Sequence, residues 1–188
     1  MKIILGSESR WRKSILKDMG YDFEVMPAHI DEKAIRFDDP EKLVTELAKA
    51  KADALFKKIK EDVILITADQ VVVSNGKILE KPENEEEARE YLRSYEKYPA
   101  KSVVAIAVVN TKTMEKSLGV DIAEIVFNKI PDDEIEKLIS QGDIFSCAGG
   151  FTIENPIIDK YVKSINGAPD SIKGLPIELT RKLINKIS

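Results

Sequence analysis

Hydrophobic residues recur at two different spacings along this chain, and the two spacings predict strands and helices in alternation. Short apolar runs at residues 3–5, 63–67 and 103–109 predict buried strands. Apolar residues three and four positions apart in residues 11–20 and 40–59 predict amphipathic helices. The chain is therefore expected to belong to the α/β class.

Further segments extend this pattern and decide what kind of sheet is expected. Residues 71–74 and 77–79 flank Asn75-Gly76, which is typical of a hairpin with a type I′ turn. Because hairpins occur beside helical segments, we expect a mixed, twisted sheet flanked by helices rather than a purely parallel one. The remaining predicted strands are 22–26, 101–110 paired with 118–128, and 157–165; the remaining helices are 83–95, 131–139 and a final one after Gly174-Leu175-Pro176.

Length and charge limit the classes of protein to consider. With 188 residues, 43% of them hydrophobic, the chain can bury a full core, and we expect one domain over residues 1–188, at most two-lobed. Lys and Arg number 29 against 33 Asp and Glu, which gives a formal net charge of −4. No bulk positive field is available for a nucleic-acid backbone, so a general nucleic-acid binder is not expected.

Cysteine, histidine and long apolar segments are scarce, which limits the metal sites, the catalytic mechanisms and the cellular locations to consider. One cysteine excludes an internal disulfide, and one histidine leaves too few soft ligands for structural zinc and no usual Ser-His-Asp route. Any metal should therefore be a hard cation held by oxygen. The longest apolar run, 103–109, is far short of the ~20 residues of a membrane span, and no apolar signal-peptide core follows the start. We expect a cytoplasmic protein without membrane partners.

Three segments carry candidate chemistry. The first segment brings hydroxyl groups and cationic side chains to the start of a helix: Gly6-Ser7-Glu8-Ser9-Arg10-Trp11-Arg12-Lys13. This combination favours the binding of an anion. The alternative is that Ser7 or Ser9 only caps the helix. In the second segment, Ala68-Asp69-Gln70, Asp69 interrupts an apolar strand. A buried carboxylate must be paired, bound to a metal or shifted in pKa. The alternative is that Asp69 faces water at a strand end or bulge. The third segment, a tight turn at residues 147–151, leads to Glu154, and Cys147 is more simply a buried packing residue.

Taken together and in order, these segments resemble the Maf family of nucleoside triphosphate pyrophosphatases. The segments that carry the resemblance are Ser7-Glu8-Ser9-Arg10-Trp11-Arg12, Asp31-Glu32, Ala48-Lys49-Ala50-Lys51, Ala68-Asp69-Gln70-Val71, Lys81-Pro82, Ala148-Gly149-Gly150-Phe151 and Gly174-Leu175-Pro176. Arg10 stands where the family usually has proline, and Asn155 where it often has glycine. The resemblance implies a two-lobed single domain, similar to the Maf and ITPase fold, with a central cleft.

The resemblance also implies an activity and a set of site residues. A nucleoside triphosphate would be cut between its α and β phosphates to a monophosphate and pyrophosphate, clearing modified nucleotides from the pool. Ser7, Arg12, Lys51 and Lys81 would bind the phosphates, and Asp69 would accept the proton of the attacking water. Glu32 and Asp69 would hold Mg²⁺ or Mn²⁺ as cofactor. Whether Asp69 acts mainly as base or as metal ligand is open.

Three further residues bear on the base of the nucleotide. Relatives that resemble dTTP/UTP pyrophosphatases have Arg, Thr and Gln where this chain has Trp11, Gln70 and Glu154, so the chain resembles the 7-methyl-GTP branch. An indole attracts the cationic methylated purine, and a carboxylate accepts from guanine's two donors. The alternatives are a core role for Trp11, a dTTP/UTP pyrophosphatase, and a non-catalytic nucleotide-binding regulator of septum formation. The family also suggests a possible homodimer.

Overall fold

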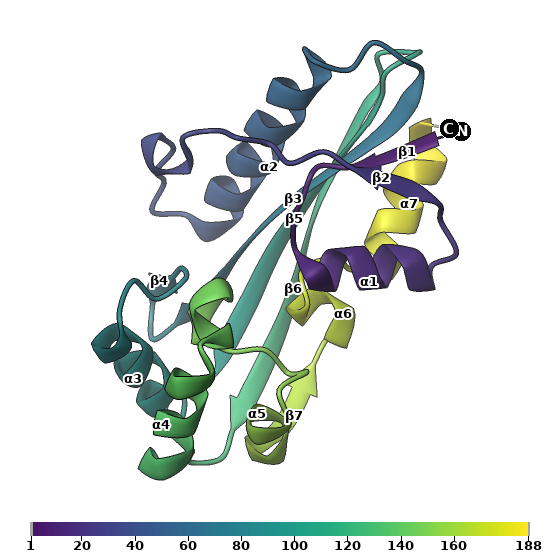
Figure 1. Ribbon diagram of the computed structural model, residues 1–188. Helices are drawn as coiled ribbons and strands as arrows, with labels where there is room; N and C mark the ends of the chain where they lie inside the picture. The colour runs from purple at the N-terminus through teal and green to yellow at the C-terminus, as the bar shows by residue number, and fades with distance from the viewer. Residues whose placement is uncertain (1, 188) are drawn as a thin grey trace. The chain divides into compact units, whose positions relative to one another are not determined.

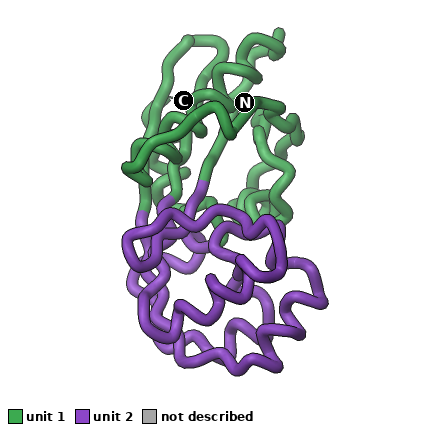
Figure 2. Tube along the Cα trace, turned by 90° about the vertical axis from the view of Figure 1, so that its left-hand side faces the viewer, with its two compact units in different colours: residues 1–69, 104–121, 173–188 green, residues 70–103, 122–172 purple. Residues whose placement is uncertain are grey.

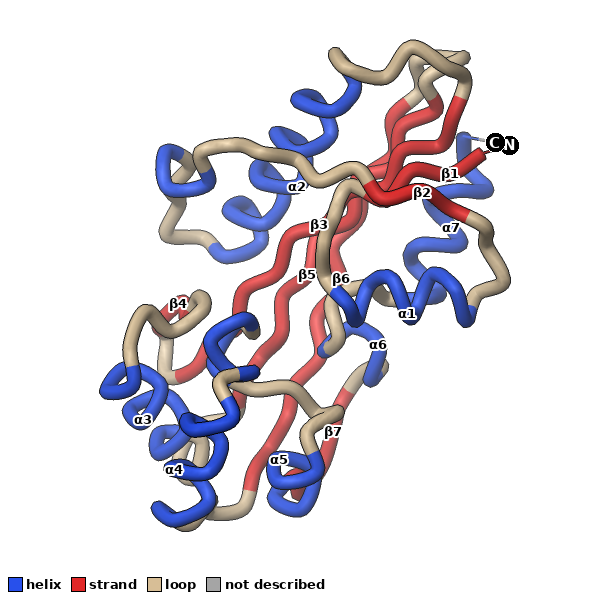
Figure 3. Tube along the Cα trace, viewed as in Figure 1, coloured by secondary structure: helices blue, strands red, loops and turns tan. Residues whose placement is uncertain are grey.

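The computed structural model describes residues 2–187, in which strands and helices follow one another in mixed order (Figures 1 and 3). In chain order the main elements are β1 (Lys2–Leu5), α1 (Arg10–Asp18), β2 (Phe23–Val25), α2 (Pro40–Phe56), β3 (Val63–Ser74), β4 (Lys77–Leu79), α3 (Glu85–Ser94), β5 (Ala100–Asn110), β6 (Lys116–Phe127), α4 (Asp132–Gln141), α5 (Pro156–Tyr161), β7 (Val162–Asn166), α6 (Pro169–Ile172) and α7 (Ile177–Ile187). Of the helices in the described part of the chain, none has the length and apolarity that crossing a membrane requires.

The strands form a mixed sheet, as the sequence predicts. Their order is β2-β1-β3-β5-β6-β7, and β4 pairs with β3 outside this path. β1 runs parallel to both β2 and β3, whereas β3 pairs antiparallel with β4 and β6 antiparallel with β7. Asn75 and Gly76 both have positive φ, 49° and 72°, which confirms the tight hairpin turn between β3 and β4.

The chain divides into two compact units (Figure 2), and each unit has its own cluster of buried hydrophobic residues. Unit 1 comprises Met1–Asp69, Val104–Asp121 and Lys173–Ser188, and unit 2 comprises Gln70–Val103 and Ile122–Ile172. Three of the four boundaries fall inside β3, β5 and β6, so each of these strands contributes residues to both units, and the fourth boundary follows α6. The single domain over residues 1–188 and its central cleft stay predictions.

In unit 1, helices cover both faces of the sheet. The side chains of Ile64, Ile66 and Ala68 in β3 join one core cluster with residues of α1 and α7. Thr67 lies between them in the strand and so points to the opposite face, where its Oγ1 donates to the carbonyl of Ala48 in α2 at 2.8 Å. Because side chains in a strand alternate, Asp69 shares the α2 face with Thr67.

Unit 2 packs its core around aromatic rings beside a glycine turn. The rings of Tyr95, Phe127 and Phe151 lie with centroids 5.3 to 5.4 Å apart. The Tyr95 hydroxyl donates to the carbonyl of Gly149 at 2.7 Å. Gly149 has φ of 69°, and a Cβ there would lie 2.8 Å from Val72, so only glycine fits this part of the predicted turn.

Two predicted elements are wrong in detail. β3 is one continuous strand through Ala68, Asp69 and Gln70, because the Asp69 carboxylate is paired and the polar residue does not have to leave the strand. The predicted strand 157–165 is instead helix α5 followed by the shorter strand β7. Asn155 caps α5 by accepting from the backbone N–H of Ile157, and Pro156 occupies the first turn, a helix-start signal visible in the sequence.

Candidate active site

The loop between β1 and α1 brings hydroxyl groups close to β3 and α2. A Cβ on Gly6 would lie 2.6 Å from the Thr67 side chain and 2.7 Å from that of Leu55, so glycine is needed for this close approach. Ser9 is the N-cap of α1, since its Oγ accepts from the backbone N–H of Arg12. Ser7 is buried, and its Oγ accepts from the Ser9 N–H. The capping alternative therefore applies to Ser9, and Ser7 is the hydroxyl left beside the cations.

The side chain of Arg12 joins three segments of unit 1. Its Nε donates to the carbonyl of Gly174 at 2.9 Å, and its Nη1 donates to the carbonyl of Ala68 at 2.9 Å and to Ser7 Oγ at 3.3 Å. Nη2 takes part in no hydrogen bond within residues 2–187. The guanidinium thus lies against the residue that precedes Asp69, with one nitrogen able to meet a phosphate oxygen.

Lys51 and Asp69 form a buried ion pair on the α2 face of the sheet. Lys51 follows Ala48 by three residues on the buried face of α2, so helix geometry places both against β3. Lys51 is 9% exposed and Asp69 6%. Lys51 Nζ donates to Asp69 Oδ1 at 2.5 Å and lies 2.9 Å from Oε1 of Glu32, which begins the short, exposed 3-10 helix Glu32–Ala34. Lys51 is therefore a buried lysine, unlike the exposed Lys49 of the same helix.

Burial and charge act in opposite directions on these groups. Burial raises the pKa of Asp69, and the positive charges of Lys51 and Arg12 oppose that rise. Burial also lowers the pKa of the Arg12 guanidinium, against the negative charges of Asp69 and Glu32. The carboxylate is therefore a stronger base than an exposed aspartate, which suits a group that accepts a proton from water.

The donor set is compatible with a hard divalent cation. Glu32 and Asp69 supply two carboxylates that already share one cation, the Lys51 ammonium. Within residues 2–187, no group of three or more Asp, Glu, His or Cys side chains could hold a metal ion by itself. Mg²⁺ commonly binds one or two carboxylates and completes its shell with substrate phosphates and water, so the pair fits a metal that arrives with a nucleotide.

Trp11 is half-buried on α1 and lies outside the core cluster of unit 1. The guanidinium carbon of Arg10 lies 4.4 Å from the centroid of the indole ring. The indole therefore already meets a cation through its face. This arrangement argues against the core role that the helical spacing left open.

The predicted residues of unit 2 lie in three different surroundings. Gln70 uses both hydrogens of its amide, which donate to Ser102 Oγ and to the carbonyl of Ile172, each at 2.8 Å. Lys81 is exposed between β4 and α3 and forms no ion pair within residues 2–187. Glu154 is exposed just before α5, and its backbone N–H donates to Thr152 Oγ1 at 3.4 Å.

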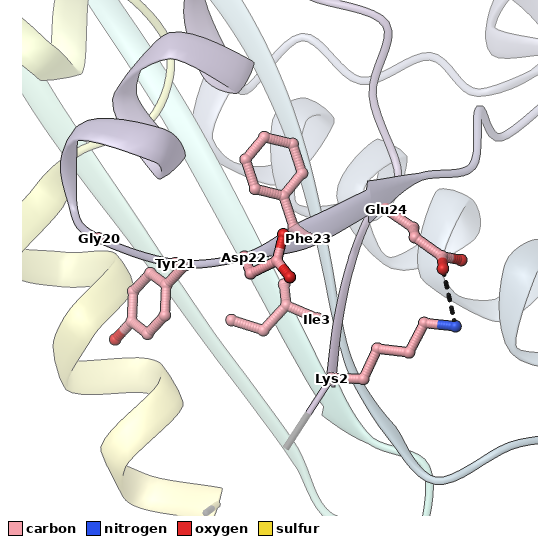
Figure 4. Close-up of a pocket in the computed structure, with 7 residues that line it drawn as sticks. All are labelled: Lys2, Ile3, Gly20, Tyr21, Asp22, Phe23 and Glu24. Atoms are coloured by element: carbon pink, nitrogen blue, oxygen red, sulfur yellow. Dashed lines mark ion pairs between the residues drawn. The ribbon is translucent and has the colours of Figure 1, made fainter.

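A separate surface hollow of about 470 Å³ lies in unit 1 (Figure 4). Its lining is Lys2, Ile3 and residues 20–24, where Lys2 pairs with Glu24 at 3.0 Å. None of the predicted site residues lines it, so this hollow is not part of the candidate site.

Comparison with known proteins identifies the family. The family described as Maf-like protein matches residues 2–187. The chain belongs to the Maf family. Its relatives include a 7-methyl-GTP pyrophosphatase of Dictyostelium discoideum, 49% identical over 99% of this chain and 97% of the relative. They also include a dTTP/UTP pyrophosphatase of Clostridium perfringens, 35% identical over 98% of this chain and 96% of the relative.

A solved structure of a dITP/XTP pyrophosphatase from Mycobacterium abscessus is also similar, at a TM-score of 0.44 and 12% identity over 99% of this chain and 94% of that chain. The family match and the relative at 49% identity confirm the family predicted from the ordered motifs for this Maf protein. The roles of its individual site residues stay predictions.

The structure adds two contacts that sequence reasoning missed. Gly174 belongs to the segment Gly174-Leu175-Pro176, and its carbonyl holds the Arg12 side chain. Asn155, which stands where the family often has glycine, caps α5, and its Nδ2 donates to Gln141 Oε1 at 2.9 Å. The Asn-Pro pair could have revealed the cap. No local signal could have revealed the contact of Arg12, because it joins residues 162 positions apart.

Proposed function

We propose that this Maf protein is a nucleoside triphosphate pyrophosphatase that cuts the bond between the α and β phosphates, with 7-methyl-GTP as its preferred substrate. The observation that carries the proposal is the buried carboxylate of Asp69, which accepts a hydrogen bond from Lys51. The guanidinium of Arg12 donates to the carbonyl of the preceding residue, Ala68. A base and two cations in one part of unit 1 are what hydrolysis of a phosphoanhydride requires.

In the proposed reaction, the residues of this chain position the triphosphate and accept a proton. Ser7, Arg12 and Lys51 bind phosphate oxygens, and Lys81 is predicted to do so as well. Asp69 accepts a proton from a water molecule whose oxygen bonds to the α phosphorus. The bond from that phosphorus to the α–β bridging oxygen breaks, and pyrophosphate leaves with the electron pair.

Glu32 and Asp69 are the residues that would hold a divalent cation, Mg²⁺ or Mn²⁺. When bound, such an ion neutralises negative charge on the phosphates. The oxygen-only donor set supports this assignment, since both ions prefer carboxylate and phosphate oxygens.

The preference for 7-methyl-GTP rests on similarity and on the chemistry of Trp11. The relative at 49% identity bears that name, against 35% for the dTTP/UTP relative. Methylation gives the purine a positive charge, and Trp11 already accepts the Arg10 cation on its ring. Glu154 is proposed to accept from guanine's donors, and Gln70 would present its remaining Oε1 acceptor, since its amide hydrogens are used. The runner-up substrates are dTTP and UTP.

The activity is tested by replacing Asp69 with asparagine. Asp69→Asn keeps the shape but cannot accept the proton, so pyrophosphate release should fall by about 10² to 10⁴-fold. Asp53→Asn is the matched control, because Asp53 lies on the exposed side of α2 and pairs with Lys116. Release from 7-methyl-GTP, GTP, dTTP and UTP is measured with Mg²⁺ or Mn²⁺. Equal activity in Asp69→Asn and Asp53→Asn would refute the role of Asp69.

The base preference is tested by replacing Trp11 with leucine. Loss of a cation–π contact of about 1–2 kcal/mol should reduce the kcat/KM ratio of 7-methyl-GTP over GTP by roughly 5- to 30-fold. Tyr98→Leu removes an exposed aromatic ring elsewhere and should leave the ratio unchanged. Faster turnover of dTTP and UTP than of 7-methyl-GTP by the wild type would instead promote the runner-up.

The same assays address the remaining predictions about role. Saturable nucleotide binding without pyrophosphate release over hours would favour the non-catalytic regulator. A cytoplasmic location, where the nucleotide pool lies, and a homodimer accompany the proposed activity as predictions.

A further inference from the structure

One cation of the chain lies between the two carboxylates that are proposed to hold a metal. Lys51 Nζ is 2.5 Å from Asp69 Oδ1 and 2.9 Å from Glu32 Oε1. The ammonium therefore occupies the space that both carboxylates would have to share with a divalent ion. The Lys51–Asp69 contact is buried, so its attraction is screened less than that of a surface pair.

The charges of this group leave little net attraction for a free metal ion. Glu32 and Asp69 carry two negative charges, and Lys51 cancels one of them. The charge of Arg12 also acts on both carboxylates and offsets the other. A divalent cation approaching without a nucleotide would meet a nearly neutral group and the repulsion of the Lys51 ammonium at close range.

We propose that Lys51 is an internal counter-ion that makes metal binding by this protein depend on the nucleotide. The inference rests on the proposed function, because it takes Glu32 and Asp69 as the metal ligands. A triphosphate supplies negative oxygens to which the flexible lysine can turn, and the carboxylates become available when it does so. Lys51 then has two partners in turn: the carboxylates in the free protein and a phosphate in the complex.

This arrangement has a chemical use. A divalent ion held by the free protein would stay beside the proposed base when no substrate is present. With Lys51 between the carboxylates, the base and its ion are assembled only around a bound triphosphate. The dependence follows from the position of one side chain and needs no change of fold.

The test measures binding of Mn²⁺ alone, by calorimetry and by the electron paramagnetic resonance signal of the free ion. Wild-type protein should bind Mn²⁺ weakly, and Lys51→Gln should bind it about tenfold or more tightly, because a neutral amide replaces the ammonium but can still donate to Asp69. Adding Glu32→Gln to Lys51→Gln should abolish the gain. Lys49→Gln is the matched control: Lys49 lies two residues away on α2, is exposed and pairs with Glu46.

Equal Mn²⁺ affinity of wild type and folded Lys51→Gln would overturn the proposal, as would an equal gain in Lys49→Gln. If circular dichroism shows that Lys51→Gln does not fold, the proposal is tested on the wild-type protein by thermal unfolding. Its thermal midpoint should be unchanged by Mn²⁺ alone and raised by Mn²⁺ with a non-hydrolysable 7-methyl-GTP analogue. An equal rise with Mn²⁺ alone would overturn the proposal.

Pyrophosphate release by the wild type is measured in parallel and separates the two conclusions. If the wild type hydrolyses nucleotides but Lys51→Gln gains no Mn²⁺ affinity, the counter-ion role fails and the proposed function stands. If Lys51→Gln gains affinity and the wild type releases no pyrophosphate, the counter-ion role stands and the proposed function fails.

Discussion

The side chain of Arg12 has a structural role and a proposed role in binding the substrate. Its Nε and Nη1 donate to the carbonyls of Gly174 and Ala68, so the protein itself fixes the orientation of the planar guanidinium. An ordered cation loses little conformational entropy when it binds a phosphate. A lysine at this position has one flexible nitrogen and cannot reproduce the same pair of contacts.

Arg12→Lys is therefore expected to be far from conservative. We expect KM for the nucleotide to rise by about tenfold and the free energy of unfolding to fall by about 1–3 kcal/mol, since two buried carbonyls lose a charged donor. Steady-state kinetics and urea unfolding measure these changes. Arg181→Lys is the control, because Arg181 is exposed on α7 and its ion pair, with Glu178 at 3.4 Å, is a surface one. An Arg12→Lys protein with wild-type KM would show that the fixed orientation of the guanidinium does not contribute to nucleotide binding.

At the scale of elements, the apolar pattern predicts most of the strands and helices but not their continuity. The polar residue Asp69 in an apolar run predicts a break in the strand, whereas β3 runs straight through it. The missing information was the partner, because Lys51 lies 18 positions earlier on a different element. The sequence does not predict helix α5 for a local reason: β-branched residues at 157–165 favour a strand, against the helix-start signal of Asn155-Pro156.

The turn at residues 147–151 yields a prediction about stability and pH. The hydroxyl of Tyr95 donates to the carbonyl of Gly149 in this turn. Burial raises the pKa of this hydroxyl well above the usual value of a tyrosine. The unfolded tyrosine loses its proton near pH 10, before the folded one does, so the free energy of unfolding should fall as pH rises above about 10. Tyr95→Phe should cost about 1 kcal/mol at pH 7 and make this decline shallower.

Urea unfolding between about pH 7 and 11 measures both effects. Tyr98→Phe removes the same hydroxyl from an exposed ring and serves as the control. A wild type and a Tyr95→Phe variant with parallel declines above pH 10 would show that the buried hydroxyl makes no contribution to the pH dependence.

At the scale of the whole molecule, family membership could be predicted because seven short motifs occur in order, although each is weak alone. The pairing of Lys51 with Asp69 and Glu32 could not be predicted, since it depends on the register of α2 against β3. The division into two units could not be predicted either. Three of its four boundaries fall within continuous strands, where the apolar pattern shows no linker.

Those boundaries lead to a prediction about cooperativity. Because β3, β5 and β6 each contribute to both units, neither unit can lose its strands without breaking an element of the other, and we expect one unfolding transition. The signals can be separated, since Trp11 lies in unit 1 and four of the five tyrosines, at positions 91, 95, 98 and 161, lie in unit 2. Ile135 is fully buried in the core of unit 2.

Ile135→Ala should remove about 2–5 kcal/mol of stability by leaving a cavity. If the chain unfolds as one unit, the midpoint reported by Trp11 fluorescence should fall by as much as the midpoint reported by tyrosine near-ultraviolet circular dichroism. Ile122→Ala makes the same change at an exposed position of unit 2 and should move neither midpoint appreciably. A tyrosine midpoint that falls while the tryptophan midpoint stays would mean that the units unfold separately, and the single domain predicted over residues 1–188 would then be two.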